Sequence, residues 1–261
     1  MPGEPARAAH SRTCDRPVHA HRPGPTGVVP PSQAVAAGAT IPPMSTARFS
    51  DITIAQFAER LASPEPVPGG GSASAIAASF SASLIAMVAS LSLGRPKYAP
   101  YEATHRRALA FATGASAAFL DLADRDADAY AAFAAALKLP RETEEQQEFR
   151  AAAVRAAARQ AAEVPLEVVR RCADLVVEVD AMAGRSNLNA ASDVQVAALL
   201  VEAAGRGAAA NVLINLPSAD DDAFSGRVTD EVMALLASIE ELAARARERV
   251  GAGRLRDPEP E

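Results

Sequence analysis

A long stretch without any charged residue, from Gly69 to Gly94, constrains the fold more than any other feature of the sequence. As a helix it is long enough to span a bilayer. It also contains seven serines spread around the helix, with no aromatic belt and no second span to pair with. A helix that is apolar on all sides is buried either in a membrane or in a protein core. We favour the close-packed central helix of a water-soluble bundle over a membrane hairpin, because small side chains let neighbouring backbones approach closely.

The composition of the 261 residues favours helices. Aromatic residues make up only 4%, Trp is absent, and alanine dominates the apolar fraction. Alanine has the highest helix propensity, and alternating strand patterns are scarce. The formal net charge of −6 argues against a nucleic-acid-binding surface, which needs a basic face. Two cysteines, Cys14 and Cys172, are too few for a disulfide framework, so we expect a cytoplasmic protein.

Histidine is as sparse as cysteine. His10, His19 and His21 lie near the N-terminus, and only His105 lies in the body of the chain. No histidine or cysteine cluster has the spacing of metal ligands, so we expect no metal site. A cysteine–histidine nucleophile lacks partners for the same reason.

Glycine and proline divide the chain from about residue 50 into six predicted helices. We expect them at about 51–62, 72–93, 101–138, 143–183, 191–216 and 227–250. Pro165 is expected to kink the fourth helix, because proline removes one backbone hydrogen bond. Gly184, Pro217 and Gly251 are expected to end the fourth, fifth and sixth helices. The prediction is therefore an all-α, single-domain bundle.

The two ends of the chain are predicted to lie outside the bundle. Residues 1–47 hold nine of the nineteen prolines and four arginines against two acidic residues, a composition typical of disorder. Because an ordinary protein start follows from Met44, residues 1–43 are either a disordered tail or a wrongly extended translation start. We expect one domain over 48–251 and a disordered C-terminal tail over 252–261.

Asp126 lies on the predicted apolar face of the third helix, four residues after Leu122 and four before Tyr130. Asp124 and Asp128 point elsewhere, because two helical positions are about 200° apart. A buried carboxylate is costly unless it is paired or protonated, and burial raises its pKa toward the range of general acid–base catalysis. On periodicity alone, a catalytic acid is as well supported as an acid at the edge of the stripe that pairs with an arginine.

A triple glycine precedes the second helix. Gly69, Gly70 and Gly71 permit positive φ and the close approach of a ligand, and free N–H groups at a helix start attract anions and carbonyl oxygens. Ser72 is equally suited to be a plain N-cap, which is the favoured alternative. The stretch is not a P-loop, because no Gly-Lys-Ser/Thr follows at the required spacing.

Two further groups have both a binding and a structural interpretation. Asn211 and Asn215 share a helix face, with Asp193 in the first turn of the same helix. Two amides can bind the edge of a heterocycle, although bridging between helices is the commoner role. Arg95 and Lys97 form a basic loop, which either holds the carboxylate of a substrate or simply faces solvent.

Nine short stretches occur in one order over about residues 50–250. They are 57–63, 68–72, 87–88, 94–98, 126–130, 138–140, 164–166, 192–198 and 211–216. Together they resemble the cyclodeaminase domain of formimidoyltransferase-cyclodeaminase and its stand-alone bacterial relatives, which include methenyltetrahydrofolate cyclohydrolases. Each stretch is a weak signal, but the ordered set is specific.

The resemblance implies a helical, dimer-forming enzyme that binds tetrahydrofolate derivatives. We expect neither a metal nor a tightly bound cofactor beside that substrate. It also implies that Asp126 is the acid–base residue. The expected substrate-binding residues are Gly69, Gly70, Gly71, Ser72, Arg95, Lys97, Tyr98, Tyr130, Asp193, Asn211 and Asn215. Pro96 stands where relatives often carry a basic or polar residue, which weakens the case for contact between this loop and a polyglutamylated substrate.

The leading expectation is closure of 5-formiminotetrahydrofolate to 5,10-methenyltetrahydrofolate with loss of ammonia. The alternative is hydrolysis of the methenyl bridge to 10-formyltetrahydrofolate. A non-catalytic helical interaction module is less favoured, because Asp126 points inward. The transferase half of the family has no room in the leading residues, so a separate formimidoyltransferase is the expected partner, with no nucleic acid and no membrane.

Overall fold

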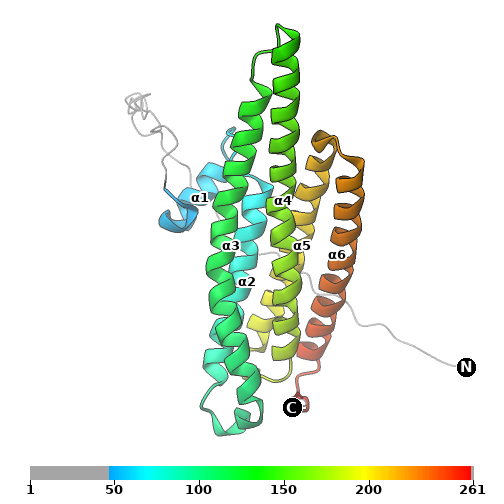
Figure 1. Cartoon of the computed structure of the whole chain (residues 1–261). Coiled ribbons are helices and arrows are strands. Elements are labelled where there is room, and N and C mark those ends of the chain that lie inside the picture. The colour runs from blue at the N-terminus through cyan, green and yellow to red at the C-terminus, as the bar shows by residue number, and fades with distance from the viewer. Residues whose placement is uncertain (1–46, 260–261) are drawn as a thin grey trace, which may run out of the picture. The chain divides into compact units, whose positions relative to one another are not determined.

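The computed structural model describes residues 47–259, so the predicted N-terminal tail lies outside the described residues, except for residue 47. Its helices are α1 (Ile54–Leu61), α2 (Gly70–Ser92), α3 (Glu102–Leu137), α4 (Glu144–Met182), α5 (Ala191–Ala219) and α6 (Asp222–Gly251). Three short 3-10 helices connect them: η1 (Phe49–Asp51), η2 (Pro96–Tyr101) and η3 (Leu188–Ala190). No strand occurs within the described range. The all-α prediction is confirmed (Figure 1).

Four helices form the body of the bundle. Helices α2, α3, α4 and α5 pack in a ring, each against the next, and α6 covers α4 and α5. The chain reverses direction at each connection from α2 to α6, and the α3–α4 hairpin extends beyond the ends of the other helices (Figure 1). We call the end at which α2 begins the upper end, and the end at which it finishes the lower end.

Helix α2 is the central helix that the uncharged stretch predicts. Ala75, Ala78, Ala82 and Ala89 are fully buried, which brings the backbones of neighbouring helices close together. Both α2 and residues 188–219 are long and apolar enough to cross a bilayer, but about half of each lies inside the bundle. The second apolar helix, which the sequence analysis overlooked, is therefore α5, a neighbour of α2 in the same core.

The serines of α2 are accommodated by hydrogen bonds to backbone carbonyls. Ser83 and Ser92 donate to the carbonyls four residues earlier, at 2.9 and 2.7 Å. Ser81 donates across the helix contact to the backbone oxygen of Ala197 at 2.8 Å. A satisfied hydroxyl costs little in a core, whereas an unsatisfied one costs roughly 1–3 kcal/mol. Seven serines are therefore compatible with a buried helix.

The helix boundaries differ from the prediction mainly around Pro217. Helix α5 continues through Pro217 to Ala219, and α6 begins at Asp222 rather than near residue 227. Pro217 is exposed, so the backbone acceptor that it leaves unpaired can bond to water. The turn is made instead by Asp220, with φ of 49°, and by the carboxylate of Asp221, which accepts from the Phe224 N–H at 2.9 Å.

The predicted disorder of the C-terminal tail is wrong for residues 252–259. The Tyr101 hydroxyl donates to the backbone oxygen of Arg256 at 2.7 Å, and Arg256 donates to the backbone oxygen of Asp180 at 2.8 Å. Glu259 accepts from Arg107 at 2.8 Å. These contacts join single side chains to partners far away in the chain, so no periodic pattern in the sequence indicates them.

Candidate active site

Asp126 lies on α3 beside the first turn of α2, at the upper end of the bundle. The Ser72 hydroxyl lies 3.0 Å from Asp126 Oδ2 and 3.0 Å from the backbone oxygen of Ala123. Burial raises the pKa of Asp126, and hydrogen bonds from the Ser72 hydroxyl and backbone N–H offset part of that rise. The carboxylate faces the start of α2, and the net shift of its pKa is upward.

The triple glycine lets Asp126 approach the start of α2. A Cβ on Gly71 would lie 2.5 Å from Cγ of Asp126, so no larger residue fits there without movement. A Cβ on Gly70 would lie 3.3 Å from Nδ2 of Asn211, which brings α5 to the same place. The glycine run thus joins α2, α3 and α5 at one point.

Both sequence-based interpretations of this run need correction. Gly69, not Ser72, is the N-cap, and its φ of −124° is extended rather than positive. Within the described residues, positive-φ glycines occur elsewhere, at Gly94, Gly184 and Gly253. The close approach that glycine permits is used by the carboxylate of Asp126, which also benefits from the positive end of the helix dipole.

The two predicted amides lie at the same end but have different surroundings. Asn215 donates to the backbone oxygen of Ala161 on α4 at 2.9 Å, so it bridges helices. Asn211 donates to its own helix at Gly207, at 2.8 Å, and faces Gly70. Of the pair, Asn211 is the one close to Asp126.

Sequence reasoning missed the contact between Ser74 and Gly207. The Ser74 hydroxyl donates to the backbone oxygen of Gly70 at 2.7 Å, and a Cβ on Gly207 would overlap that hydroxyl. The only signal in the sequence is that Gly207 precedes Asn211 by one helical turn. The pair packs the start of α2, which Asp126 contacts, against α5.

Tyr130 lies one turn beyond Asp126 on α3 and is 40% exposed. Residues four apart share a helix face, so Tyr130 lies on the same face of α3 as Asp126. The structure therefore groups Tyr130 with Asp126, Gly70, Gly71 and Asn211 at the upper end.

The remaining predicted residues lie at the lower end. Arg95, Lys97 and Tyr98 follow α2, and Asp193 is in the first turn of α5. Helix α2 has 23 residues and spans about 35 Å at 1.5 Å per residue. One copy of the chain therefore does not bring these residues to Asp126.

Tyr98 has a structural role at the lower end. Its side chain is buried, its hydroxyl accepts from the Leu188 N–H at 3.1 Å, and Lys97 Nζ lies 5.5 Å from its ring centroid. Arg95 borders a cavity of about 150 Å³ next to the fully buried His105, whose Nε2 lies 2.7 Å from the backbone oxygen of Arg185. Burial lowers the pKa of His105.

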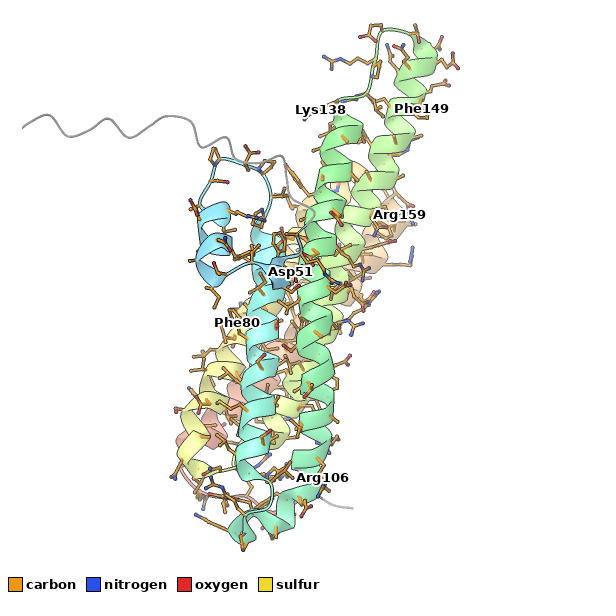
Figure 2. The ribbon with its side chains drawn as sticks, turned by 90° about the vertical axis from the view of Figure 1, so that its left-hand side faces the viewer. Asp51, Phe80, Arg106, Lys138, Phe149 and Arg159 are labelled. Carbon is orange, nitrogen blue, oxygen red and sulfur yellow. The ribbon has the colours of Figure 1, made fainter. Side chains whose placement is uncertain are left out.

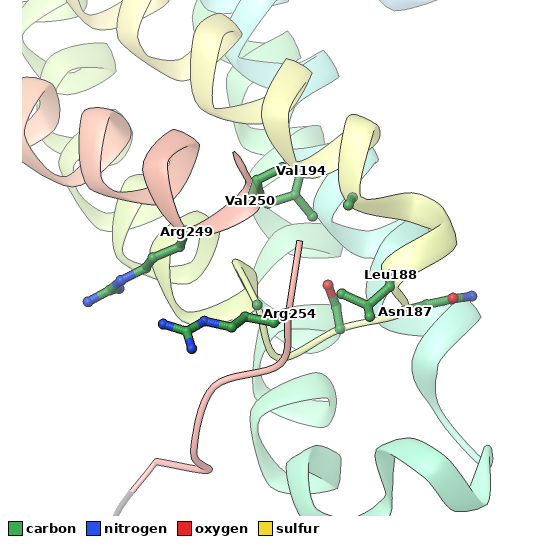
Figure 3. A pocket seen from close by; sticks show the side chains of 9 residues that line it. Asn187, Leu188, Val194, Arg249, Val250 and Arg254 are labelled. Atoms are coloured by element: carbon green, nitrogen blue, oxygen red, sulfur yellow. The ribbon is translucent and has the colours of Figure 1, made fainter. Parts of the chain in front are cut away.

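A second, much smaller cavity lies between α5, η3 and the C-terminal segment (Figure 3). Asn187, Leu188, Arg249 and Arg254 are among the residues that line it. Its volume of about 10 Å³ is close to the minimum for a single water molecule. Neither cavity borders Asp126. Among the described residues, no group of three or more His, Cys, Asp and Glu side chains is placed to hold a metal ion.

Comparison with known proteins identifies the family. The profile of the formiminotransferase-cyclodeaminase family matches residues 53–234. Methenyltetrahydrofolate cyclohydrolase from Methylorubrum extorquens is 37% identical over 185 residues, which cover 71% of this chain and 89% of that protein. Formimidoyltransferase-cyclodeaminase from Sus scrofa is 38% identical over 196 residues, which cover 75% of this chain but 36% of that longer protein.

The fold comparison agrees. The crystal structure of formiminotetrahydrofolate cyclodeaminase from Thermotoga maritima superimposes with a TM-score of 0.70 at 28% sequence identity. The match covers 78% of this chain and 98% of that one. With an inward aspartate on α3 beside the glycine-led start of the central helix, and with these matches over most of its length, the chain belongs to the formiminotransferase-cyclodeaminase family.

Proposed function

We propose that this protein is a folate one-carbon enzyme that closes 5-formiminotetrahydrofolate to 5,10-methenyltetrahydrofolate and releases ammonia. The observation that carries the proposal is the partly buried carboxylate of Asp126, with its raised pKa and its Ser72 partner. Relatives named for cyclodeaminase and cyclohydrolase activities supply the substrate class.

The reaction needs one group that accepts a proton and returns it. Attack of the folate N10 on the carbon of the protonated formimino group forms a tetrahedral carbon between N5 and N10 that bears an amino group, and the N10 proton must leave. The amino group on that carbon must gain a proton to depart as ammonia, which leaves the methenyl bridge. Asp126 can accept the first proton as a carboxylate and return it as a carboxylic acid.

Ser72 suits both protonation states of Asp126. While Asp126 is ionised, the Ser72 hydroxyl donates its proton to Oδ2. Once Asp126 is protonated, Ser72 can accept from it and turn its own proton to the backbone oxygen of Ala123, also 3.0 Å away. The carboxyl group can therefore gain and lose a proton without leaving a buried polar atom unpaired.

Hydrolysis of 5,10-methenyltetrahydrofolate to 10-formyltetrahydrofolate is the second candidate. The cyclohydrolase relative favours it, because this chain matches 89% of the length of that protein. Water attacks the methenyl carbon and Asp126 takes one of its protons. Asp126 returns that proton to N5 as the bond between N5 and the carbon breaks, and the remaining hydroxyl proton leaves to solvent as the formyl C=O forms. The tetrahedral carbon and the proton carrier are the same in both reactions.

Purified protein tests the two reactions separately. With 5-formiminotetrahydrofolate, the leading proposal requires methenyl absorbance to rise together with ammonia, in equal amounts. With 5,10-methenyltetrahydrofolate, the second candidate requires that absorbance to fall faster than in buffer alone. Activity with neither substrate, in protein that is folded by circular dichroism, would overturn the assignment.

We also propose that the active form is a homodimer. Two adjacent helices, α2 and α5, leave large apolar side chains exposed: Phe80, Met87, Leu91, Val196, Leu199, Leu213 and Ile214. We call these seven residues the apolar face, and Phe80 is labelled on it in Figure 2. Large exposed apolar side chains that gather on neighbouring helices are typical of interfaces.

A two-fold pairing through this face would also explain the divided site. If α2 packs antiparallel against α2 of a second copy, the lower end of one copy lies beside the upper end of the other. Arg95 and Lys97 of the second copy would then stand near Asp126, where the positive charges could hold the acidic tail of a folate. We further propose that a separate formimidoyltransferase supplies the formimino group, that the reaction takes place in the cytoplasm, and that activity survives dialysis against a chelator.

A further inference from the structure

Asp124, two residues before Asp126 on α3, binds the segment around Phe49, which has no role in the proposed reaction so far. Its Oδ1 accepts from the Phe49 backbone N–H at 2.7 Å, and its Oδ2 accepts from Arg48 Nε at 3.1 Å. The same guanidinium also donates to Asp121 at 2.7 Å. Two α3 carboxylates, Asp121 and Asp124, thus bind Arg48 and Phe49 close to the first described residue.

The segment between this anchor and α2 forms a flap, which we define as residues 50–69. It contains the end of η1, α1 and the loop that leads to Gly69. Its far end joins α2 at the first turn, where Ser72 bonds to Asp126. Both ends of the flap are therefore held by the same turn of α3, one by Asp124 and the other by Asp126.

Packing holds the middle of the flap only weakly. No α1 side chain is buried within the part of the chain that the structure describes, and Ile54 is 75% exposed. The main contact to the body runs through Phe49, which packs against the core and meets Phe57 edge to face, with ring centroids 5.3 Å apart. Figure 2 shows α1 beside the upper turns of α2, with Asp51 close to α2 and α3. The anchor at Asp124 therefore decides where the flap lies.

We propose that Asp124 is a positioning residue of the folate site: it holds the flap beside Asp126 and so sets the space that the substrate enters. The inference rests on the proposed function, because the substrate is a folate. Asp124 itself bonds to Arg48 and to the Phe49 N–H, and it carries no proton in the proposed reaction. Its loss should weaken substrate binding and leave the proton transfer by Asp126 intact, which separates KM from kcat.

Three variants compare how much each contact of Asp124 contributes to KM. Asp124→Ala removes every acceptor, and a hydrogen bond to a charged group is worth roughly a factor of ten or more, so we expect KM to rise about tenfold. Arg48→Ala removes only exposed ion pairs and should raise KM by less than about fivefold. Asp124→Asn keeps an oxygen for the Phe49 N–H and should fall between the two. In all three, kcat should stay within about twofold, and the acid limb of the pH profile should not move.

A second measurement does not depend on activity. Trypsin cleavage after Arg60, within α1, reports how often the flap leaves the bundle. We expect faster cleavage at Arg60 in Asp124→Ala than in the wild type, and slower cleavage in both when 5,10-methenyltetrahydrofolate is present. Asp128→Asn, an exposed carboxylate on the same helix, is the matched control and should behave as the wild type.

The outcomes separate the two proposals. Unchanged KM and unchanged cleavage in folded Asp124→Ala would overturn the role of Asp124. So would a fall in kcat that matches a fall in melting temperature, because that pattern reports general destabilisation. If Asp124→Ala does not fold, the same criteria apply to Arg48→Ala and Asp124→Asn. If the wild type acts on neither folate and no folate slows cleavage, the proposed function fails, whereas faster cleavage in the variants would still establish the anchor.

Discussion

Gly71 and Asp126 face each other so closely that position 71 has no room for a side chain. A Cβ there would lie 2.5 Å from Cγ of Asp126, well inside van der Waals contact. The carboxylate of α3 is therefore positioned by the backbone of α2 as well as by the Ser72 hydroxyl. A small displacement of either helix should therefore move the carboxylate that carries the reacting proton.

Gly71→Ala should abolish most of the activity while the bundle still folds. The added methyl group pushes the Asp126 carboxylate away from the start of α2, and a displacement of about 1 Å can cost roughly 10²-fold in rate. Turnover with the two folate substrates measures the loss, and circular dichroism measures the retained helix content.

Gly114→Ala is the matched control for that substitution. Gly114 is a helical glycine on α3, and a Cβ there meets nothing within 4 Å. Activity should be unchanged, and the free energy of unfolding should rise by about 0.4–1 kcal/mol, because alanine restricts the unfolded chain. Equal losses of activity in Gly71→Ala and Gly114→Ala would contradict the steric argument.

Asp126→Asn should lower turnover by about 10²–10⁴-fold, the range typical of a general acid–base group. The amide keeps the size of the side chain, so folding and folate binding should persist. Asp128→Asn serves as the control, since Asp128 is exposed, whereas Asp124 is unsuitable because it anchors Phe49. Wild-type turnover in Asp126→Asn would remove Asp126 from the mechanism.

The pH dependence of activity should report the raised pKa of Asp126. Burial raises that pKa, and the hydrogen bonds from Ser72 lower it in part. The acid limb of kcat/KM should therefore lie above the ordinary aspartate value, and Ser72→Ala should move it to still higher pH. An acid limb that does not respond to Ser72→Ala would show that another group controls it.

The contribution of Asp126 to stability should change with pH in the opposite direction to that of an ordinary salt-bridged aspartate. Because the pKa is raised in the folded state, the stabilisation from Asp126 is fully present below the unfolded pKa and is lost as the pH rises through the folded pKa. Melting temperatures of the wild type and Asp126→Asn, measured across that range, should diverge toward neutral pH, with the variant the more stable. Parallel curves would contradict the direction of the shift.

Leu199→Glu should dissociate the proposed dimer. Leu199 belongs to the apolar face and is half exposed, and a charge is costly at a buried interface. Sedimentation should show a dimer for the wild type and a monomer of 27.0 kDa for the variant. Phe149→Glu, an exposed position on the α3–α4 hairpin, should leave the dimer intact. A monomeric wild type at micromolar concentration would refute the pairing.

Much of the fold could be predicted because helices depend on local signals. Alanine content, glycine and proline placement and the period of apolar residues predicted six helices, and the structure has them within the described residues. Pro217 misled the prediction, since a proline near an exposed helix end costs little. The order of residues 252–259 was missed because it depends on contacts with Tyr101, Arg107 and Asp180, far away in the chain.

The candidate site was predictable in part for the same reason. Asp126 and Tyr130 share one helix face, so their grouping follows from spacing alone. The need for glycine at position 71 follows from a contact between two helices, which no local pattern shows. The separation of Arg95 from Asp126 follows from the length and direction of α2, which a list of motifs in sequence order does not contain.

The alanine-rich core also determines which amino-acid substitutions this protein tolerates. In cores built from leucine and phenylalanine, damage comes mostly from truncated side chains that leave voids. Here, positions such as Ala82 and Ala198 are fully buried and have almost nothing left to truncate. The damaging changes are enlargements: at Gly205 even a methyl group would lie 2.9 Å from Cδ1 of Ile239. A mutational scan of α2 and α5 should therefore show an inverted pattern, in which gaining a few carbon atoms is worse than losing them.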